Sequence, residues 1–431
     1  MSLSVTNAAN TSNGGPTRGH EYLSAVKDVT ASSFMSENDR VEALQATYEA
    51  LARLESPWDT YIRLQMNMTN NEQPGVMAGL KIIKDLRLMA KWHEKGCIPM
   101  TSLQLAELVG NCDPQLLHRF LRLLVANGFL EQVPAGKFKP NQFCIELANP
   151  EFDTLTDYYY AIKRHAFDLM PEHLADRGYK NPTDPNDTVL KKFTNHGNLW
   201  SYLKENSKAG EMFNILQKVS TTKEPAWMDI YPHHKLVDES DSSLPLLVDV
   251  GGGIGQDLLR FYSVYPEAAS RLYLEDLQEV IADAHTKSII PNTVNKLEYS
   301  FFTPQPVKSK KSEAEILMYS VNYSSGARAY FMHHIIHDWP DALARKILQM
   351  QKSAMKPGYS RLLIHDHVLD DEKSRVAPAA YDIAMMVSLA GQERTESQWL
   401  ALFDSVGLKV IKFWKKPPDT FCVIEVEVPI S

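Results

Sequence analysis

The sequence predicts an α/β protein in which a helical N-terminal part precedes a Rossmann-like, mostly parallel sheet. From Leu244 onward, apolar strand-like segments alternate with helical segments, which indicates a parallel sheet covered by helices on both faces. Between residues 76 and 150, three helical segments precede two alternating segments around a Pro-Ala-Gly turn. This order is typical of a winged helix.

Length and composition agree with more than one folded domain. The chain has 431 residues, and its 44% hydrophobic and 10% aromatic content suits a packed core. The formal charge of −8 and the pI near 6.0 argue against a nucleic-acid partner, because binding nucleic acid usually requires a basic face.

Cysteine spacing and hydropathy indicate the kind of cellular compartment in which this protein is expected. The four cysteines are widely spaced with no C-x-x-C pair, which favours a reducing compartment over a disulfide framework or a zinc site. The N-terminus has no signal-peptide pattern, and no apolar run approaches the roughly 18 residues of a membrane span. We therefore expect a cytoplasmic protein without a membrane partner.

The N-terminal region divides by composition. Residues 1–20 are rich in Ser, Asn, Thr and Gly and predict a flexible tail. From Glu21 to about Arg63, apolar residues recur at helical spacing. These amphipathic helices can pack on a partner subunit or within the chain, and the sequence leaves both alternatives open.

Helix-capping signals define the next elements. One helix is predicted to end at Gly96, and a second begins at a Thr101 or Ser102 cap. A third has Asp113 as its N-cap and Pro114 at its first position. Residues 129–148 alternate about the turn, as a hairpin would.

A winged helix can bind DNA, but the charges here argue against it. Between residues 101 and 150 the basic residues are balanced by acidic ones: Arg119, Arg122, Lys137 and Lys139 against Glu107, Asp113, Glu131 and Glu146. A net-neutral unit attracts phosphates weakly, and phosphate attraction supplies most non-specific affinity. A structural or dimerising role is favoured.

Residues 151–240 are mostly helical by pattern, with a polar, Pro- and Asn-rich interruption. Aromatic and methionine side chains follow at helical spacing. They can form core, or they can line a pocket for a flat ligand because they directly precede the sheet domain. The candidate substrate-binding residues are Phe213, Trp227, Tyr231 and, further along the chain, Met386.

A glycine-rich turn is the strongest chemical signal in the chain. Asp249 ends an apolar strand and is followed by Val-Gly-Gly-Gly-Ile-Gly. The dinucleotide fingerprint needs glycine at position 256, where Gln256 stands. An acid at the strand end repels a pyrophosphate and suits a cationic ligand with an ammonium and a sulfonium. We therefore predict S-adenosylmethionine rather than NAD, contacted by Asp249, Gly251 and Gly253.

The second strand, in RLYLEDL, ends in Glu275 and Asp276. An acid at this position can hydrogen-bond both ribose hydroxyls of a nucleoside, and a solvated loop acid is the alternative. Asp276 is the preferred candidate. Further strands are predicted in ARAYFMHHI, SRLLIHDHVL, GLKVIKFW and TFCVIEVEV, the last two joined as an antiparallel hairpin by the short KKPPD segment.

From about Gly75 to Val428 the chain resembles the caffeate-type class I O-methyltransferases of plants and fungi. The specific motifs are LVDVGGGIG, EDL, HDW and GQERTESQW. The resemblance implies a homodimer, with a winged-helix dimerisation domain and a seven-stranded Rossmann-like catalytic domain. The expected segments are a tail at 1–20, a dimerisation domain at 21–150, a helical connector and substrate-pocket region at 151–240, and a catalytic domain at 241–431.

The resemblance also implies roles for individual residues. The catalytic base falls on His337 and two flanking acids fall on Asp366 and Glu393. Cofactor contacts fall on Gly251, Asp276, Ser300, Phe301 and His333. The implied activity is methyl transfer from S-adenosylmethionine to a hydroxyl of a small phenolic or polyketide-derived secondary metabolite.

The chemistry of these residues agrees with that activity. Methyl transfer needs a deprotonated acceptor in near-attack geometry. A phenol has a pKa of about 10, so a neutral imidazole with a pKa of about 6.5 can take its proton as the new bond forms. Asp366 and Glu393 would orient the ring of His337 and stabilise its cation.

The histidines around His337 also suggest a metal site, and strand geometry argues against it. His333 and His337 are four residues apart, which spans about 13 Å in a strand, whereas zinc ligands each lie about 2 Å from the ion. We therefore predict no metal. His334 is expected on the opposite face, packed or exposed, and His365 and His367 are expected to be structural.

Two departures from the family pattern keep a second activity open. Ser300 stands where the family usually has an acid, and residues 308–326 form an insertion into a short connection. Some fungal proteins of this type catalyse pericyclic reactions or dehydrations of polyketide-derived substrates, with S-adenosylmethionine as a non-reacting cofactor. A third hypothesis, a winged-helix regulator, requires a basic recognition helix, and the sequence lacks one.

Overall fold

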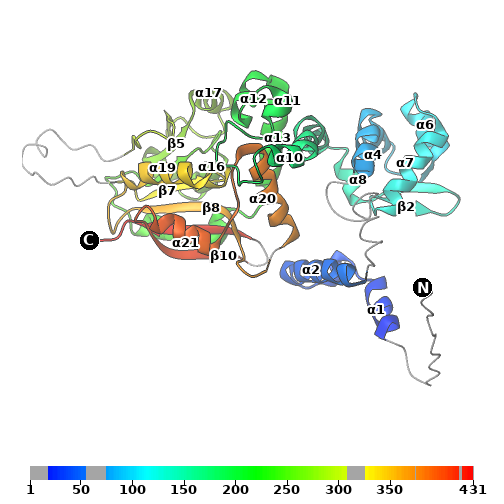
Figure 1. Cartoon of the computed structure of the whole chain (residues 1–431), viewed down its shortest axis with the longest axis horizontal. Coiled ribbons are helices and arrows are strands. Elements are labelled where there is room, and N and C mark those ends of the chain that lie inside the picture. Colours follow the sequence, from blue (N-terminus) through cyan, green and yellow to red (C-terminus); the bar gives the residue numbers. More distant parts are fainter. Residues whose placement is uncertain (1–17, 55–73, 308–325, 374, 417–419, 431) are drawn as a thin grey trace, which may run out of the picture. The chain divides into compact units, whose positions relative to one another are not determined.

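The computed structural model describes residues 18–54, 74–307, 326–373, 375–416 and 420–430 (Figure 1). It contains two compact units, residues 1–56 and 57–431. The first unit contains α1 (Arg18–Lys27), the 3-10 helix η1 (Ala31–Ser33) and α2 (Glu37–Leu54). The helical pattern predicted from residue 21 is present to Leu54. The rest of that segment, most of the predicted tail and most of the 308–326 insertion lie outside the described residues.

The second unit begins with the predicted helices and hairpin. It contains α4 (Pro74–Asp85), α5 (Leu88–Glu94), β1 (Met100–Thr101), α6 (Ser102–Val109), α7 (Pro114–Ala126), β2 (Leu130–Val133), β3 (Lys137–Pro140) and α8 (Gln142–Glu146). The strands form one antiparallel sheet in the order β1-β3-β2. Buried apolar side chains join the helices to this sheet, among them Trp92, Leu105, Leu121 and Phe138.

Local signals explain these elements, with two corrections. Thr101 caps α6 by accepting from Gln104 N, and Asp113 caps α7. The single helix predicted to end at Gly96 is wrong: Arg87 has φ +53 and divides it into α4 and α5. The alternation predicted to residue 148 ends at Pro140, because Asn141 caps the short helix α8.

A helical segment connects this region to the large sheet. It comprises α9 (Pro150–Tyr158), a π-helical turn η3 (Tyr159–Lys163), α10 (Arg164–Asp176), α11 (Lys191–Thr194), α12 (Leu199–Glu205), α13 (Ser207–Lys223), α14 (Trp227–Ile230) and α15 (His234–Asp238). Tyr158, Leu199, Met212 and Leu389 share one buried cluster, so the connector packs onto a helix of the sheet domain. The predicted boundaries at 150 and 240 stay predictions.

The large sheet has the strand order β10-β11-β8-β7-β4-β5-β6. The strands are β4 (Leu247–Val250), β5 (Leu272–Asp276), β6 (Asn295–Glu298), β7 (Ala329–His333), β8 (Arg361–Leu369), β10 (Lys409–Lys415) and β11 (Phe421–Glu427). Strands β4 to β8 are parallel, and β11 is antiparallel to both β8 and β10. The seven-stranded Rossmann-like sheet and its closing hairpin are confirmed. The two-residue β9 (Arg394–Thr395) pairs with β8.

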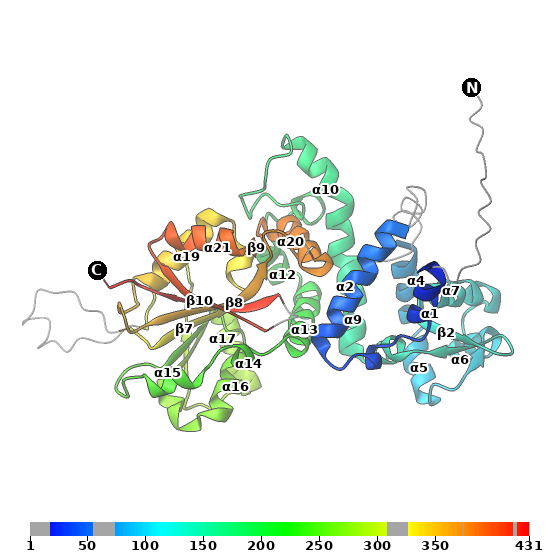
Figure 2. The ribbon, with the colours of Figure 1, turned by 90° about the horizontal axis from the view of Figure 1, so that it is seen from below.

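Helices cover both faces of this sheet, as Figure 2 shows. They include α16 (Gln256–Val264), η4 (Pro266–Arg271), α17 (Gln278–Lys287), η5 (Ile336–Asp338), α19 (Asp341–Lys352), α20 (Val376–Leu389) and α21 (Glu396–Asp404). One face packs on α19 and α21, and the other on α15 and α16 (Figure 2). None of the helices in the described part of the chain is long and apolar enough to cross a membrane.

The position of β4 determines where a ligand can bind. Its neighbours β5 and β7 lie on opposite sides, so the strand order reverses there. Ligands of open α/β sheets bind at the carboxyl ends of the strands next to such a reversal. The glycine turn follows β4 and His333 ends β7. Both therefore lie at this edge.

Candidate active site

The glycine turn folds tightly against the ends of β4 and β5. Gly251, Gly253 and Gly255 have φ values of 72°, 61° and 95°, in the left-handed region that favours glycine. A Cβ on Gly252 would lie 2.5 Å from the Asp249 carboxylate and 2.6 Å from a methyl of Leu274. Position 252 therefore requires glycine, because any side chain there would meet Asp249 and Leu274.

Asp249 lies beneath this turn. It is 2% exposed, and its Oδ2 has no hydrogen-bond partner among the described residues. Burial, reinforced by the negative charges of Asp257, Asp276 and Glu275, raises the pKa of Asp249 well above its usual value. A nearby cation would oppose this shift and favour the ionised form of the carboxyl.

Asp276 and Glu275 point to different environments. Asp276 Oδ2 accepts from Gly253 N at 2.8 Å, and Oδ1 accepts from Leu277 N at 2.7 Å. Burial raises the pKa of Asp276 to about 6, and these two backbone bonds oppose the shift. Glu275 is fully buried and accepts from Gln305 Nε2 at 2.8 Å. Of these two acids, Asp276 is the one whose side chain bonds to the glycine turn among the described residues.

Aromatic side chains lie beside the turn. The Phe301 ring is edge-on to Phe302 and Trp339, with centroids 5.1 and 5.9 Å away, and it lies 3.7 Å from the Cβ that Gly251 would have. Ser300 accepts from Thr303 through its backbone carbonyl. A cavity of about 410 Å³ adjoins these rings, lined by Pro185, Asn186, Asn198, Trp200, Phe302, Trp339, Leu343 and Lys346. The sequence analysis did not single out Trp339, although it belongs to the HDW motif.

His337 lies in η5 with both ring nitrogens near carboxylates. Its Nδ1 is 2.8 Å from Glu393 Oε1, and its Nε2 is 3.4 Å from Asp338 Oδ1. Burial alone would lower the pKa of His337, but the charges of Glu393, Asp338 and Asp366 raise it to about 10. The ring is therefore an imidazolium at neutral pH in the protein without ligands.

The two acids predicted beside His337 differ in their contacts. Burial would raise the pKa of Glu393, but the charge of His337 and their hydrogen bond lower it below the usual value. Asp366 is fully buried on β8, and neither of its carboxylate oxygens has a hydrogen-bond partner in the described residues. Burial raises its pKa to about 6, and the charge of His337 opposes this shift. Only Glu393 bonds to the histidine.

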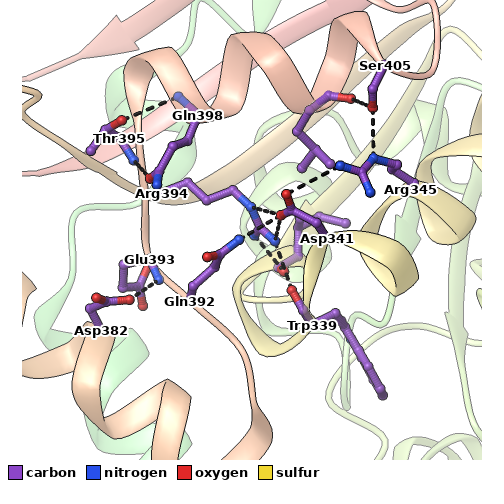
Figure 3. Close-up of polar contacts among 12 residues, drawn as sticks. Trp339, Asp341, Arg345, Asp382, Gln392, Glu393, Arg394, Thr395, Gln398 and Ser405 are labelled. Carbon is purple, nitrogen blue, oxygen red and sulfur yellow. Dashed lines mark hydrogen bonds and ion pairs between the residues drawn. The ribbon is translucent and has the colours of Figure 1, made fainter. Parts of the chain in front are cut away.

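The segment that contains Glu393 is fixed to the loop that contains His337. Gln392 N donates to the His337 carbonyl at 2.9 Å, and a Cβ on Gly391 would lie 2.2 Å from the same oxygen. Glu393 N donates to Asp382 Oδ1 at 2.8 Å (Figure 3). Position 391 thus requires glycine for this close approach.

Arg394 completes this connection. Its side chain is fully buried and donates to the carbonyls of Ile336 and Trp339 at 3.1 and 2.9 Å. It also forms an ion pair of 2.9 Å with Asp341, as Figure 3 shows. One guanidinium therefore binds both ends of the loop that positions His337. The sequence analysis did not identify this residue.

Comparison with known proteins now assigns the family. A model of the O-methyltransferase domain matches residues 228–409. Over 427 residues the chain is 42% identical to O-methyltransferase mfmE of Annulohypoxylon moriforme, covering 97% of this chain and 99% of that protein. The chain belongs to the O-methyltransferase family.

Further relatives include proteins with two kinds of activity. O-methyltransferase asqD of Emericella nidulans is 30% identical over 380 residues, 87% of this chain and 92% of that protein. The structure of LepI in complex with SAM superposes with a TM-score of 0.80 at 26% identity, over 96% of this chain and 100% of that chain. A structure described as a pericyclic reaction enzyme superposes with a TM-score of 0.79 at 26% identity, over 95% of this chain and 100% of that chain. The predicted family resemblance is confirmed.

In this O-methyltransferase family member, the histidines near His337 form a packed group. His333 Nδ1 is 2.7 Å from Asp257 Oδ2, and its ring stacks on His365 with centroids 4.2 Å apart. The prediction that His334 occupies the opposite face is wrong: β7 ends at His333, and His334 has φ +55, which brings the two rings to 4.4 Å. The ring of His367 packs on that of Phe421, with centroids 4.0 Å apart.

The four predicted substrate-binding residues lie in different places. Trp227 is fully buried and Tyr231 is 2% exposed, and both belong to the core beneath the sheet. Phe213 is partly buried and edge-on to Trp200, a residue of the 410 Å³ cavity, at 5.6 Å. Met386 packs beside the small cluster around Val387. Phe213 therefore contacts a residue that lines the cavity, whereas Trp227 and Tyr231 are core residues.

Proposed function

We propose that this family member is an S-adenosylmethionine-dependent O-methyltransferase acting on a hydroxyl of a small aromatic or polyketide-derived metabolite, with His337 as general base. The single observation that supports this most is the buried His337–Glu393 pair, 2.8 Å apart. It lies at the strand edge where the reversal at β4 favours ligand binding. The 42% identity to an O-methyltransferase over nearly the whole chain supports the same activity.

The residues at this edge fit the cofactor. The glycine turn leaves space beside Gly253, where an added Cβ would meet nothing closer than Gln256 Oε1 at 3.7 Å, and Asp276 keeps acceptor capacity for ribose hydroxyls beside it. A cationic ligand would oppose the raised pKa of Asp249 and favour its ionised form, and Phe301 supplies an apolar ring face. His333 and Ser300 would contact the same ligand. When bound, S-adenosylmethionine supplies a methyl group on a cationic sulfur that leaves readily.

The proton transfer follows from the arrangement around His337. Glu393 holds the proton on Nδ1, so Nε2 is the atom that would accept the proton of the substrate hydroxyl. Asp338 lies 3.4 Å from that nitrogen and would give way to the substrate. A cationic ligand nearby disfavours the imidazolium and so lowers the pKa of His337 toward neutrality. Asp366 would stabilise the imidazolium after transfer through its charge.

Label transfer tests the proposal. The protein is incubated with methyl-labelled S-adenosylmethionine and a panel of phenolic and 2-pyridone polyketides. We expect label in a product ether, and a loss of about 100-fold or more in His337→Gln, the usual range for a general base. His173→Gln, a buried histidine of α10, is the matched control and should keep the activity. Product without label that disappears in His337→Gln would overturn methyl transfer.

A specific observation favours a second candidate, a pericyclase or dehydratase with a non-reacting cofactor. The raised pKa of His337 leaves a proton on Nε2 at neutral pH, which can be donated to a carbonyl or to a departing hydroxyl. The likeness at 26% identity to a structure described as a pericyclic reaction enzyme supports this alternative. Unlabelled product that depends on His337 is its expected result.

We also propose a homodimer assembled through the N-terminal helices. Several apolar side chains on α1, the residues after it, and α2 are exposed: Tyr22, Leu23, Val26, Val29, Leu44 and Leu54. Exposed apolar side chains on amphipathic helices favour a partner surface. Light scattering on the purified chain should give twice the mass of 48.8 kDa, and a monomer across the accessible concentration range would contradict it.

A further inference from the structure

Three potential ligand atoms converge beside β7, and none of them has a hydrogen-bond partner among the described residues. They are Glu224 Oε2, His333 Nε2 and His334 Nε2, and all three lie within 4.8 Å of one another. Glu224 Oε2 is 3.8 Å from His333 Nε2 and 3.5 Å from His334 Nε2. Buried polar atoms are normally hydrogen-bonded, so three unpaired atoms facing one another need an explanation.

The backbone creates this convergence. Neighbouring residues of a strand point to opposite faces, but His333 is the last residue of β7 and His334 adopts φ +55. This left-handed residue brings the two imidazoles together, edge to face, with centroids 4.4 Å apart. A positive φ is uncommon outside glycine, although histidine adopts it more often than most residues do, so the turn at residue 334 rather than strand alternation sets how the two rings meet.

Surrounding groups fix each ring with Nε2 toward the centre. Asp257 Oδ2 lies 2.7 Å from His333 Nδ1 and holds the proton there, so Nε2 keeps a free lone pair. A carboxylate behind a histidine in this way is the usual outer support of a metal-binding imidazole. His365 stacks on His333, and Phe421 stacks on His334 with an interplanar angle of 16°.

We propose that Glu224, His333 and His334 form a binding site for a divalent transition-metal cation of the zinc class. Two imidazole nitrogens and one carboxylate oxygen are a ligand set that zinc accepts, with a fourth position left for water. In a tetrahedral site with bonds of about 2.05 Å, neighbouring ligand atoms lie roughly 3.3 Å apart. The separations of 3.5 and 3.8 Å need only a small closure.

The charge of the site also favours a cation. The Glu224 side chain is 13% exposed, so its carboxylate is largely withdrawn from solvent. Within the described residues its Oε2 meets no hydrogen-bond donor. A bound dication would neutralise this carboxylate and satisfy both imidazole lone pairs at once. Strand spacing would separate His333 from His337, but His333 and His334 are neighbours whose rings meet at the end of β7.

Cobalt binding tests the site without relying on activity. Metal-stripped full-length protein is titrated with Co²⁺, whose visible absorption reports tetrahedral nitrogen and oxygen ligands, and Zn²⁺ is then added as a competitor. We expect saturation at one ion per chain and displacement by Zn²⁺. Glu224→Gln and His334→Asn should weaken the affinity for Co²⁺ by at least about tenfold, and Asp257→Asn should weaken it by about 10–100-fold. His173 is also buried, and neither of its nitrogens has a hydrogen-bond partner in the described part of the chain, so His173→Asn should bind Co²⁺ as the native protein does.

Two outcomes would overturn the metal site. One is the absence of saturable Co²⁺ binding, or equal affinity in native and Glu224→Gln proteins that both fold by circular dichroism. The other concerns the ammonium of S-adenosylmethionine, whose three N–H groups match the same three acceptors. If Glu224→Gln weakens S-adenosylmethionine binding in calorimetry while no metal binds the native protein, the site serves that ammonium. Both results leave the proposed methyl transfer intact, because label transfer measures it separately.

Discussion

His337 and Glu393 form a buried pair, with Nδ1 2.8 Å from Oε1, in two segments 56 residues apart. Each changes the other: the carboxylate helps to raise the pKa of His337 to about 10, and the imidazolium lowers the pKa of Glu393. Neither segment belongs to a long helix or strand. Their meeting depends on the contacts that Gly391, Gln392 and Arg394 make with the loop after β7.

Replacing Glu393 with glutamine should lower the pKa of His337. Glutamine can keep a hydrogen bond to Nδ1 but removes the negative charge that most strongly opposes the effect of burial. The proton of His337 should then titrate well below pH 10 in ¹⁵N-edited NMR. Labelled-methyl transfer should fall by about tenfold or more, because the ring loses its orienting acid. An unchanged titration would show that Asp338 and Asp366 dominate.

The pH dependence of stability follows from the same pair. The folded-state pKa of His337 is above its unfolded value of 6.5, so its stabilisation is complete below about pH 6.5 and is lost as pH rises toward 10. Thermal unfolding of the native protein should show this loss between pH 7 and 10. His337→Gln should show a smaller loss over that range. Equal slopes in the two proteins would contradict the assignment.

The pH dependence of the reaction separates the two candidate activities. If His337 acts as a base, the rate at saturating cofactor should rise about tenfold per pH unit below its pKa. If it acts as an acid, the rate should fall as pH passes that pKa. Measuring the rate of product formation with one substrate between pH 6 and 10 shows whether the rate rises or falls with pH. A flat profile would exclude proton transfer by His337 as the rate-determining event.

Arg394→Met should destabilise the protein by roughly 2–4 kcal/mol, because two buried carbonyls lose their donor. Activity should fall as well, since the loop that positions His337 loses its connection to the Glu393 segment. Arg345→Met is the matched control: Arg345 also pairs with Asp341, but its side chain is 43% exposed. That change should cost less than about 1 kcal/mol in urea unfolding. Equal losses in both variants would show that Asp341 alone matters.

The sequence predicted those parts of the molecule that depend on local periodicity. Strand–helix alternation after Leu244 and the glycine turn at 251–255 both follow from patterns within a few residues. Helix caps at Thr101 and Asp113 were equally local, because one side chain satisfies the neighbouring backbone. These features are properties of short segments.

The parts that sequence could not predict depend on where a strand stops and on contacts between distant segments. Strand alternation placed His334 opposite His333, but the left-handed turn at residue 334 has no sequence signature. Of the two acids near His337, only Glu393 bonds, a distinction set by the packing of its loop rather than by any motif. The helical spacing of aromatic residues around Trp227 was compatible with both a core and a pocket, and the structure places Trp227 in the core.

Neutralising each of the two neighbouring acids at the end of β5 should affect cofactor binding differently. Asp276→Asn should weaken S-adenosylmethionine binding by about tenfold in calorimetry, because an amide replaces one acceptor oxygen beside the glycine turn. Glu275→Gln should leave binding unchanged, since that side chain is buried against Gln305.

Burial raises the pKa of Glu275 to about 8, so it is mostly neutral at pH 7, and glutamine resembles its native form. Because the folded-state pKa exceeds the unfolded value, the native protein loses stability as pH rises from about 4.5 to 8. Glu275→Gln lacks this loss, so its melting temperature relative to native should be higher at pH 9 than at pH 6. A weaker cofactor affinity in Glu275→Gln than in Asp276→Asn would reverse the assignment of the ribose-binding acid.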